Sequence, residues 1–331
     1  MVGTAFQLFI LAIVAVYHRV CMPCDRRRYP PPGNFVEIDG YRLHYYSAGT
    51  GSPTIVFDHS VGSFGWANYH VFTALSKTNR VVICDRAGYG WSDASDKPRT
   101  SQQVVSEFAQ VLERANIEPP YVLVGDSFGG YTVRLYAQNF PDNVAGMVLT
   151  HCLHEDLVLN YPWKIEFLWI LLTVIFKIVE VFAALGWVRL MGILQVFEFL
   201  KPELRRFPQE ELNRIKFSYY QSKHWGAMFS EMRNLKISSR QMQPTQSLGS
   251  LPLLVIEAST FLQSSPLMDL LPRKIVDRTW SQMQQKLLEL SDRSQLMFAE
   301  NSSHFVWVDR PDVMIAAIRT VLEIIENDKN R

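Results

Sequence analysis

The chain has 331 residues, of which 48% are hydrophobic and 12% aromatic, which suits one large α/β domain with an insertion or two domains. Its 33 Lys and Arg residues balance 32 Asp and Glu residues, and this near-neutral charge argues against a nucleic-acid-binding protein with a basic face. Four cysteines are too few for a disulfide framework, and the Cys21-x-x-Cys24 pair has no second pair to complete a zinc site. We therefore expect no metal and no cofactor.

The N-terminal segment Val2–Tyr17 is almost wholly apolar and slightly short for a membrane span. No Lys or Arg precedes Arg19, whereas three arginines follow at 26–28, and this asymmetry keeps the C-terminal side cytoplasmic. We predict an uncleaved single-pass membrane anchor at residues 1–20, followed by a basic, Pro-rich linker at 21–34. The alternative is a cleaved signal peptide, which would make the protein secreted or luminal.

Strand-like and helix-like runs alternate after the linker. Phe35–Tyr46 is typical of a hairpin that turns at Asp39-Gly40. Helical spacing occurs at 101–115 and 311–326, and short apolar runs typical of strands lie at 54–57, 80–84, 121–124, 144–150, 251–257 and 296–299. The pattern predicts an α/β fold with a mostly parallel central sheet and helices on both faces.

A long block between two of these strands shows no strand signal. Its first part, Trp163–Leu200, is very apolar. We interpret residues 157–250 as a helical cap (lid) inserted into a core made of 35–156 and 251–331. Either the cap is simply well packed, or part of its surface lies in a membrane interface. A second membrane span is not expected, because charged residues interrupt the run at 164, 166, 177 and 180.

The strand at Tyr121–Val124 runs directly into a Gly-x-Ser-x-Gly motif, Gly125-Asp126-Ser127-Phe128-Gly129. This pattern is typical of a nucleophile elbow, a sharp strand-to-helix turn that exposes a strained serine at the top of a sheet. The flanking glycines lack a Cβ and so avoid steric clashes in this sharp turn. The Phe128 amide, at the start of a helix, would face an oxyanion formed at Ser127.

Serine needs a base, and His304 is the histidine in the right context. It follows the last predicted strand and precedes the last helix, so it lies at the same sheet edge as Ser127. The second donor of an oxyanion hole would come from the loop at 58–63, with the Val61 amide as the candidate. His59 in that loop is expected to brace it rather than to act as a base.

These motifs together resemble the α/β-hydrolase-fold serine hydrolases, an esterase- and lipase-like superfamily, over about residues 35–326. Four segments carry the resemblance in the family's order: 58–62, similar to its His-Gly oxyanion segment; 85–92, its Asp-x-x-Gly-x-Gly-x-Ser turn; 125–129, its elbow; and Ser303–Phe305 with Pro311, its histidine loop. The resemblance implies Ser127 as nucleophile and His304 as general base and acid in acyl-enzyme hydrolysis. Ser60 departs from the family's usual Gly, and Asp126 stands where His is common.

The third member of the catalytic triad is the main departure. The family's acid usually follows the penultimate strand, but Phe261 stands where the aspartate should be. Some relatives take the acid from the end of the preceding strand, and on that precedent we favour Asp156. Glu155, Glu257 and Asp269 are the alternatives.

The sequence therefore predicts a membrane-associated serine hydrolase that cleaves an apolar carboxylic ester such as a lipid. Its expected partners are that small-molecule substrate and a membrane, with no nucleic acid. The alternative is a non-catalytic α/β-hydrolase-like protein that binds a ligand or a partner, which the displaced acid and Ser60 favour.

Overall fold

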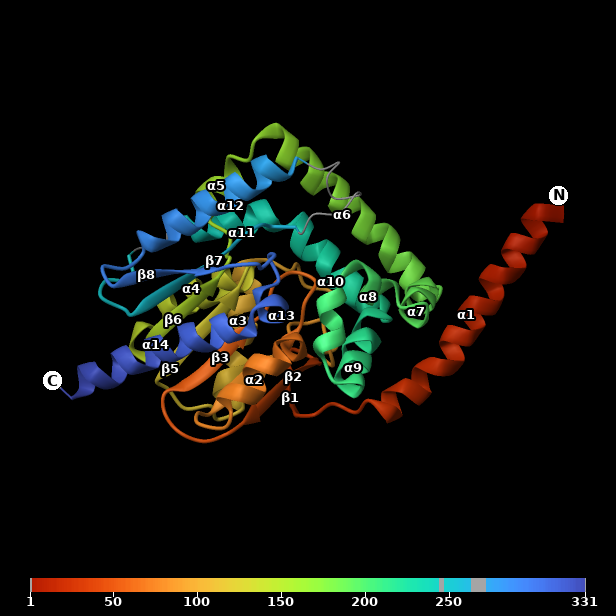
Figure 1. Ribbon diagram of the computed structural model, residues 1–331. Coiled ribbons are helices and arrows are strands. Elements are labelled where there is room, and N and C mark those ends of the chain that lie inside the picture. Colours follow the sequence, from red (N-terminus) through yellow and green to blue (C-terminus); the bar gives the residue numbers. More distant parts are fainter. Residues whose placement is uncertain (1, 244–246, 263–271, 331) are drawn as a thin grey trace.

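A computed structural model describes residues 2–243, 247–262 and 272–330 of the chain. Within these ranges the centre is an eight-stranded sheet with strand order β1-β2-β4-β3-β5-β6-β7-β8 (Figure 1). The strands are β1 (Asn34–Ile38), β2 (Tyr41–Ala48), β3 (Thr54–Asp58), β4 (Val81–Cys84), β5 (Tyr121–Asp126), β6 (Val144–Thr150), β7 (Leu253–Ala258) and β8 (Ser294–Ala299). The predicted hairpin and the six predicted core strands are confirmed.

The sheet is parallel except at one edge. Strands β1 and β2 form the hairpin, with Asp39 and Gly40 both at positive φ, as a two-residue type I′ turn requires. Strand β2 also pairs antiparallel with β4, and all other neighbours are parallel. Every residue of β3, β4 and β5 is buried, because helices cover both faces, and this explains their unbroken apolar runs.

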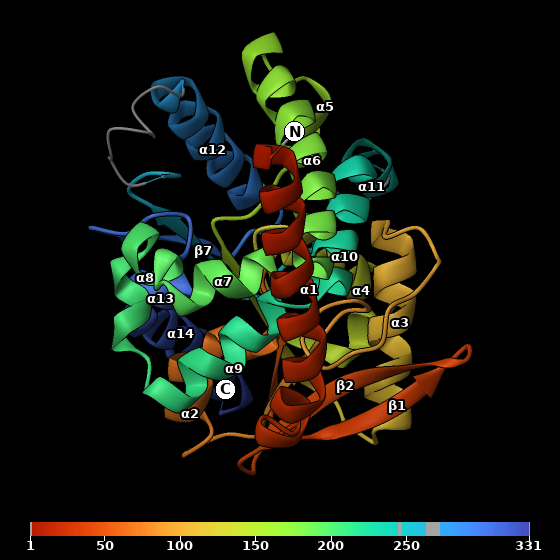
Figure 2. The same cartoon turned by 90° about the vertical axis from the view of Figure 1, so that its right-hand side faces the viewer.

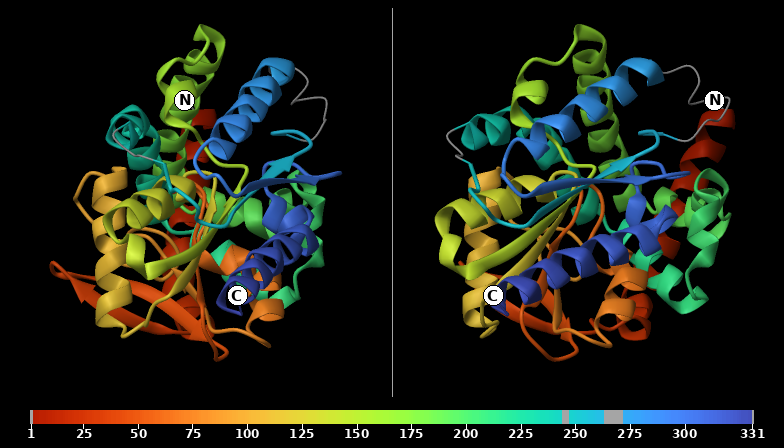
Figure 3. Two further views of the ribbon diagram at one scale, coloured as in Figure 1. Left: turned by 90° about the vertical axis from the view of Figure 1, so that its left-hand side faces the viewer. Right: turned by 60° about the vertical axis from the view of Figure 1, so that its left-hand side comes forward.

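The helices are α1 (Val2–Arg28), α2 (Tyr69–Leu75), α3 (Ser101–Arg114), α4 (Gly129–Asn139), α5 (Glu155–Leu159), α6 (Trp163–Ala184), α7 (Trp187–Ile193), α8 (Val196–Leu200), α9 (Gln209–Tyr219), α10 (Ser222–Arg233), α11 (Leu235–Met242), α12 (Arg273–Leu288), α13 (Val306–Asp309) and α14 (Pro311–Lys329). Helices α3, α4 and α12 pack into one core, and α2, α13 and α14 pack into the core on the opposite face of the sheet (Figure 3). The predicted two-faced α/β architecture is confirmed.

Helices α5 to α11, which we call the cap, lie between β6 and β7 in the sequence (Figures 1 and 2). Helix α10 packs along α6 and also lies on the loops that follow β3 and β4. A side chain at Gly62 would meet Met228 of α10, and one at Gly88 would meet Ala227. The cap therefore covers the carboxyl edge of the sheet.

Helix α1 differs from the predicted anchor and linker, because it continues through Pro23 to Arg28 and so includes the first part of segment 21–34. Its second half is tied to α7, where Arg189 pairs with Asp25 and donates to His18 Nδ1 at 3.1 Å. Its first half projects from the molecule (Figure 1). By length and composition, α6 is the one helix in the described ranges that could cross a membrane, although its charged residues led us to expect no span there.

Candidate active site

Five loops meet above the carboxyl ends of the parallel strands. The strand order reverses around β3, which is flanked by β4 and β5, and such a switch point is where sites form in open α/β sheets. The loops after β3, β5, β6, β7 and β8 carry His59, Ser127, His151, Phe261 and His304 respectively. All of these side chains are buried except Phe261, which is half-buried.

Ser127 occupies the turn between β5 and α4 with φ of 54°, a conformation that residues other than Gly rarely adopt. Its amide donates to the Thr150 carbonyl at 3.0 Å, which ties the turn to the end of β6. A Cβ at Gly125 would lie 2.8 Å from the Gly130 nitrogen, and one at Gly129 would collide with the Asp58 carbonyl. The Gly-x-Ser-x-Gly spacing is thus required by close backbone approach on both sides of a strained serine.

Two amides are placed as oxyanion-hole candidates. Phe128 is the N-cap residue of α4, and Val61 lies in the loop after β3 that contacts the elbow. Within the described part of the chain, neither amide donates a hydrogen bond to a protein acceptor. Unpaired amides at a helix N-terminus favour binding of negative charge.

The loop after β3 is held by His59 and Arg86. His59 Nδ1 lies 3.0 Å from the Ser60 carbonyl, and His59 Nε2 accepts from the Arg86 amide at 3.3 Å. Burial, and then the Arg86 charge, lower the pKa of His59 to about 4, so its ring is neutral. With both ring nitrogens occupied by backbone groups, His59 braces the loop and is not free to act as a base.

The Arg86 side chain is itself buried and joins the sheet to the cap. It donates to Asp58 at 2.8 Å and to Glu231 of α10 at 2.8 and 3.1 Å, and it also donates to the carbonyls of His59 and Ser60. One guanidinium therefore fixes the cap helix and the candidate oxyanion loop together. This pairing could not be predicted from the sequence, because Glu231 is 145 positions away from Arg86.

His304 lies on the loop between β8 and α13. Its amide donates to the Phe261 carbonyl at 3.2 Å, and its ring packs on the Phe261 ring at 4.5 Å between centroids. Asp309 steadies the loop by accepting from the Ser303 amide at 2.8 Å and from its hydroxyl at 2.6 Å. Burial, and then the Lys201 charge, lower the pKa of His304 to about 3. His304 is thus a neutral, buried imidazole.

The ring partner of His304 is a histidine and not a carboxylate. His304 Nδ1 lies 2.8 Å from His151 Nδ1. His151 directly follows Thr150, whose carbonyl accepts from the Ser127 amide, so the histidine pair adjoins the elbow. No described residue is bonded to His304 Nε2 or to Ser127 Oγ, and the described residues include no hydrogen bond between these two atoms.

None of the described carboxylates proposed from the sequence bonds to His304. Glu155 forms a two-pronged ion pair with Arg134 at 2.8 Å, and Asp156 enters α5 with an exposed side chain. Glu257 stays within β7, while Asp269 lies outside the described residues. The structure does not bring Asp156 to His304. The chain turns at His151, with φ of 47°, and the ring of this first residue after β6 contacts His304.

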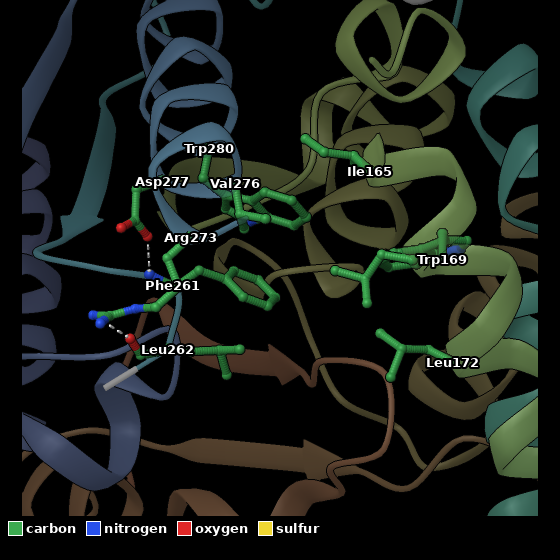
Figure 4. Close-up of a pocket in the computed structure, with 10 residues that line it drawn as sticks. Ile165, Trp169, Leu172, Phe261, Leu262, Arg273, Val276, Asp277 and Trp280 are labelled. Carbon is green, nitrogen blue, oxygen red and sulfur yellow. Dashed lines mark hydrogen bonds between the residues drawn. The ribbon is translucent and has the colours of Figure 1, made fainter. Parts of the chain in front are cut away.

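Figure 4 shows a small apolar pocket with a volume of about 50 Å³. It adjoins His304, because the rings of Phe261 and Trp280, which line it, also contact the His304 ring. Its walls come from α6, from α12 and from the loop after β7, and they include Ile165, Leu168, Trp169, Leu172, Phe261, Leu262, Val276 and Trp280. Phe261 is held in place because its amide donates to Asp277 at 2.7 Å. Phe261 therefore connects the pocket to His304.

No group of three or more His, Cys, Asp or Glu side chains within residues 2–243, 247–262 and 272–330 is arranged to hold a metal ion.

Comparison with known proteins gives the same fold. Residues 53–270 match the family described as alpha/beta hydrolase fold. The chain is 26% identical to the uncharacterized protein YbdG of Bacillus subtilis (strain 168) over 146 residues, which is 44% of this chain and 45% of YbdG. It is 24% identical to the uncharacterized protein YqjL of the same organism over 285 residues, covering 86% of this chain and 89% of YqjL.

A solved structure with a similar fold is the enol-lactonase from Burkholderia xenovorans LB400. The two chains align with a TM-score of 0.61 and 18% identity, covering 88% of this chain and all of the enol-lactonase. At this identity the similarity concerns the fold alone.

Proposed function

Because the chain belongs to the alpha/beta hydrolase fold family, we propose that it is a serine hydrolase of apolar carboxylic esters, with Ser127 as the nucleophile. The family assignment confirms the resemblance drawn from four sequence segments. The observation that carries the proposal is Ser127 itself, held at φ of 54° between β5 and α4 at the carboxyl edge of the sheet. Such a strained serine is the arrangement that nucleophilic acyl transfer uses.

The proposed chemistry has two steps. Ser127 Oγ attacks the ester carbonyl while His304 Nε2 takes its proton, and the alcohol then leaves with that proton. Water next attacks the acyl group on Ser127 and loses a proton to His304 Nε2, which returns it to Ser127 Oγ as the acyl–oxygen bond breaks and the carboxylic acid is released. The amides of Phe128 and Val61 would donate to the oxyanion in both steps.

The pocket beside His304 supports an apolar acyl group as substrate. Eight of its ten lining residues are aliphatic or aromatic, and the other two are Arg273 and Asp277. Apolar walls stabilise an acyl chain in proportion to the apolar area removed from water. The enol-lactonase with a similar fold is named for an ester-type substrate, which agrees with a serine nucleophile acting on an acyl carbon.

The direct test is hydrolysis of p-nitrophenyl esters by the full chain in detergent. Ser127→Ala should abolish hydrolysis. Ser101→Ala is a matched control, because Ser101 is also buried and its hydroxyl has no hydrogen-bond partner among the described residues. Equal activity in the wild type and Ser127→Ala would refute the proposal.

Membrane association is a second part of the proposal, with α1 as a single-pass anchor and the enzyme domain on the cytoplasmic side. Helix α6, which by length and composition could also cross a membrane, packs on α10 and lines the pocket, so we assign its exposed face to the membrane interface. Large apolar side chains are exposed along two helices: on α1, Phe9, Ile13, Val16, Tyr17 and Val20; on α6, Trp163, Phe167, Ile170, Leu171, Val174, Ile175, Ile178, Val181 and Phe182. Contiguous exposed apolar surface of this kind favours a membrane interface. The opposite face of α6 lines the pocket, which favours a lipid ester as substrate.

Two measurements test this part. Binding to liposomes should weaken when Leu171 and Val174 on the exposed face of α6 become Asp. It should persist when two polar residues of α3, the exposed Gln102 and the half-buried Gln110, become Asp. In sealed microsomes, added protease should digest the enzyme domain; protection of that domain would contradict the cytoplasmic orientation and favour a luminal or secreted protein.

A non-catalytic ligand-binding protein is the second candidate. The observation that favours it is the absence of a carboxylate on His304 among the described residues. Tight binding of a fatty acyl ligand without any Ser127-dependent turnover would establish this candidate instead.

A further inference from the structure

We propose that His151 is the positioning residue for His304 and takes the place that a carboxylate holds in a Ser-His-acid triad. This inference rests on the proposed function. It begins from the 2.8 Å separation of the two Nδ1 atoms, which is the distance of a direct hydrogen bond. One of these nitrogens must donate and the other accept, so a single proton lies between them.

The proposed reaction decides which nitrogen carries that proton. His304 can take the serine proton only if its Nε2 is an unprotonated acceptor, so its own proton must be on Nδ1. His151 Nδ1 is then the acceptor, and the His151 proton is on Nε2. In this arrangement His151 does for His304 what the aspartate of a triad does: it selects the tautomer and fixes the ring plane.

The backbone of His151 is held from two sides. Its amide donates to the Ile256 carbonyl of β7 at 2.8 Å, and the preceding Thr150 carbonyl accepts from the Ser127 amide at 3.0 Å. Its φ of 47° lies in the left-handed region, which His, Asn and Asp tolerate better than most residues. The geometry that aims the ring at His304 is therefore built into the sheet edge, and Asn or Asp could replace His151 with little backbone strain.

A neutral acceptor has a distinct consequence for the pH dependence. Among the described residues, the charged or titratable groups around His304 are His151, Lys201 of the cap with its partners Asp309 (2.6 Å) and Glu203 (3.6 Å), and Asp277 of α12, which holds Phe261. The first of these directly faces the ring. Unlike an aspartate, neutral His151 gives the His304 imidazolium no opposite charge, so His304 stays unprotonated to lower pH.

The test uses three replacements of His151 in the full chain, with ester hydrolysis measured across pH. His151→Leu removes the acceptor and should lower kcat by about 10²-fold or more. His151→Asn keeps an acceptor oxygen and should recover part of that loss. His151→Asp supplies a carboxylate and should move the acid limb of kcat/KM to higher pH by at least about one unit, which a purely structural role would not do.

His154→Asn is the matched control. His154 is a neighbouring buried histidine that caps α5 by accepting from the Asp156 amide, and asparagine preserves such a cap. Its kcat and pH profile should match the wild type. If His151→Leu keeps the wild-type kcat, or if His151→Asp leaves the acid limb unmoved while Ser127→Ala is inactive, the inference is overturned and the proposed function stands.

A spectroscopic arm does not depend on turnover. Nitrogen-15 spectra of the histidine rings should show one proton shared between the two Nδ1 atoms, lost in His151→Leu and retained in His154→Asn. Absence of that proton in the wild type overturns the inference. Its presence in a protein that hydrolyses no ester refutes the proposed function and confines the pair to a structural role.

Discussion

Replacing Arg86 by methionine should destabilise the protein strongly and disturb the candidate oxyanion loop. Arg86 is 4% exposed and lies between Asp58 and Glu231, neither of which is exposed. It also donates to the carbonyls of His59 and Ser60. Methionine would fill a similar volume but would leave the charges of two buried carboxylates without their cation and would remove a donor from two buried carbonyls. Glu231 would keep the Tyr89 hydroxyl as a donor, and the Ser60 carbonyl would keep the Ser63 amide.

The size of the effect follows from the cost of an uncompensated buried charge. Removing one partner of a buried ion pair typically lowers the free energy of unfolding by about 3–5 kcal/mol. Since Arg86 serves two carboxylates, we expect a loss at the upper end, near 5 kcal/mol. A second change, Glu231→Gln, should recover part of that loss, because it removes one of the stranded charges.

The assay is urea unfolding of the full chain in detergent, followed by tryptophan fluorescence. Arg42→Met is the control, because the Arg42 pair with Asp93 is exposed and should contribute little. A loss below about 1 kcal/mol in Arg86→Met, or no recovery on adding Glu231→Gln, would refute this account of how the cap and the loop are joined.

Three further changes probe the elbow, a buried carboxyl and the pocket. Gly129→Ala should lower stability by about 1–3 kcal/mol and reduce kcat, because its Cβ would collide with the Asp58 carbonyl; unchanged melting and activity would contradict that contact. Burial raises the pKa of the Asp126 carboxyl to about 7 in the folded protein. The protonated carboxyl therefore favours the folded state at low pH, and this stabilisation is lost as pH rises from about 4 to 7. Because Asn cannot ionise, the free energy of unfolding of Asp126→Asn should rise relative to that of the wild type by up to about 4 kcal/mol between pH 4 and pH 8, at ~1.4 kcal/mol per pKa unit. If the difference in unfolding free energy between the two proteins does not vary with pH, the pKa shift is contradicted. Leu172→Trp should fill the pocket and lower kcat/KM for long acyl esters by about 10-fold relative to short ones. Ile170→Trp, on the exposed face of the same helix, should leave that ratio unchanged.

The fold was predictable because its strands are buried on both faces. Val144–Thr150 is a continuous apolar run in the sequence, and β6 has the same bounds. The hairpin turn at Asp39-Gly40 was equally clear, since both residues tolerate positive φ. Helix α1 was less predictable: we placed the end of the anchor at residue 20 and a linker after it, yet the helix continues through Pro23 to Arg28 and packs on α7.

The partner of His304 could not be predicted, because the decisive feature is a backbone turn. We predicted the triad partner at the end of β6, where His151 lies, but we considered only the carboxylates there. Only the turn at φ of 47° shows that the residue following Thr150 points at His304. A histidine directly after a buried strand, where an aspartate would fit, is the one signal that could have found it.

In the proposed mechanism Ser127 carries the acyl group during turnover, and mass spectrometry can detect that acyl-enzyme. The full chain is mixed with an excess of a p-nitrophenyl acyl ester, quenched in acid within the first turnover, and digested for peptide mapping. We predict one added acyl mass, located on Ser127 and absent from Ser127→Ala. Release of p-nitrophenol with no adduct, or an adduct on another residue that persists in Ser127→Ala, would contradict the account.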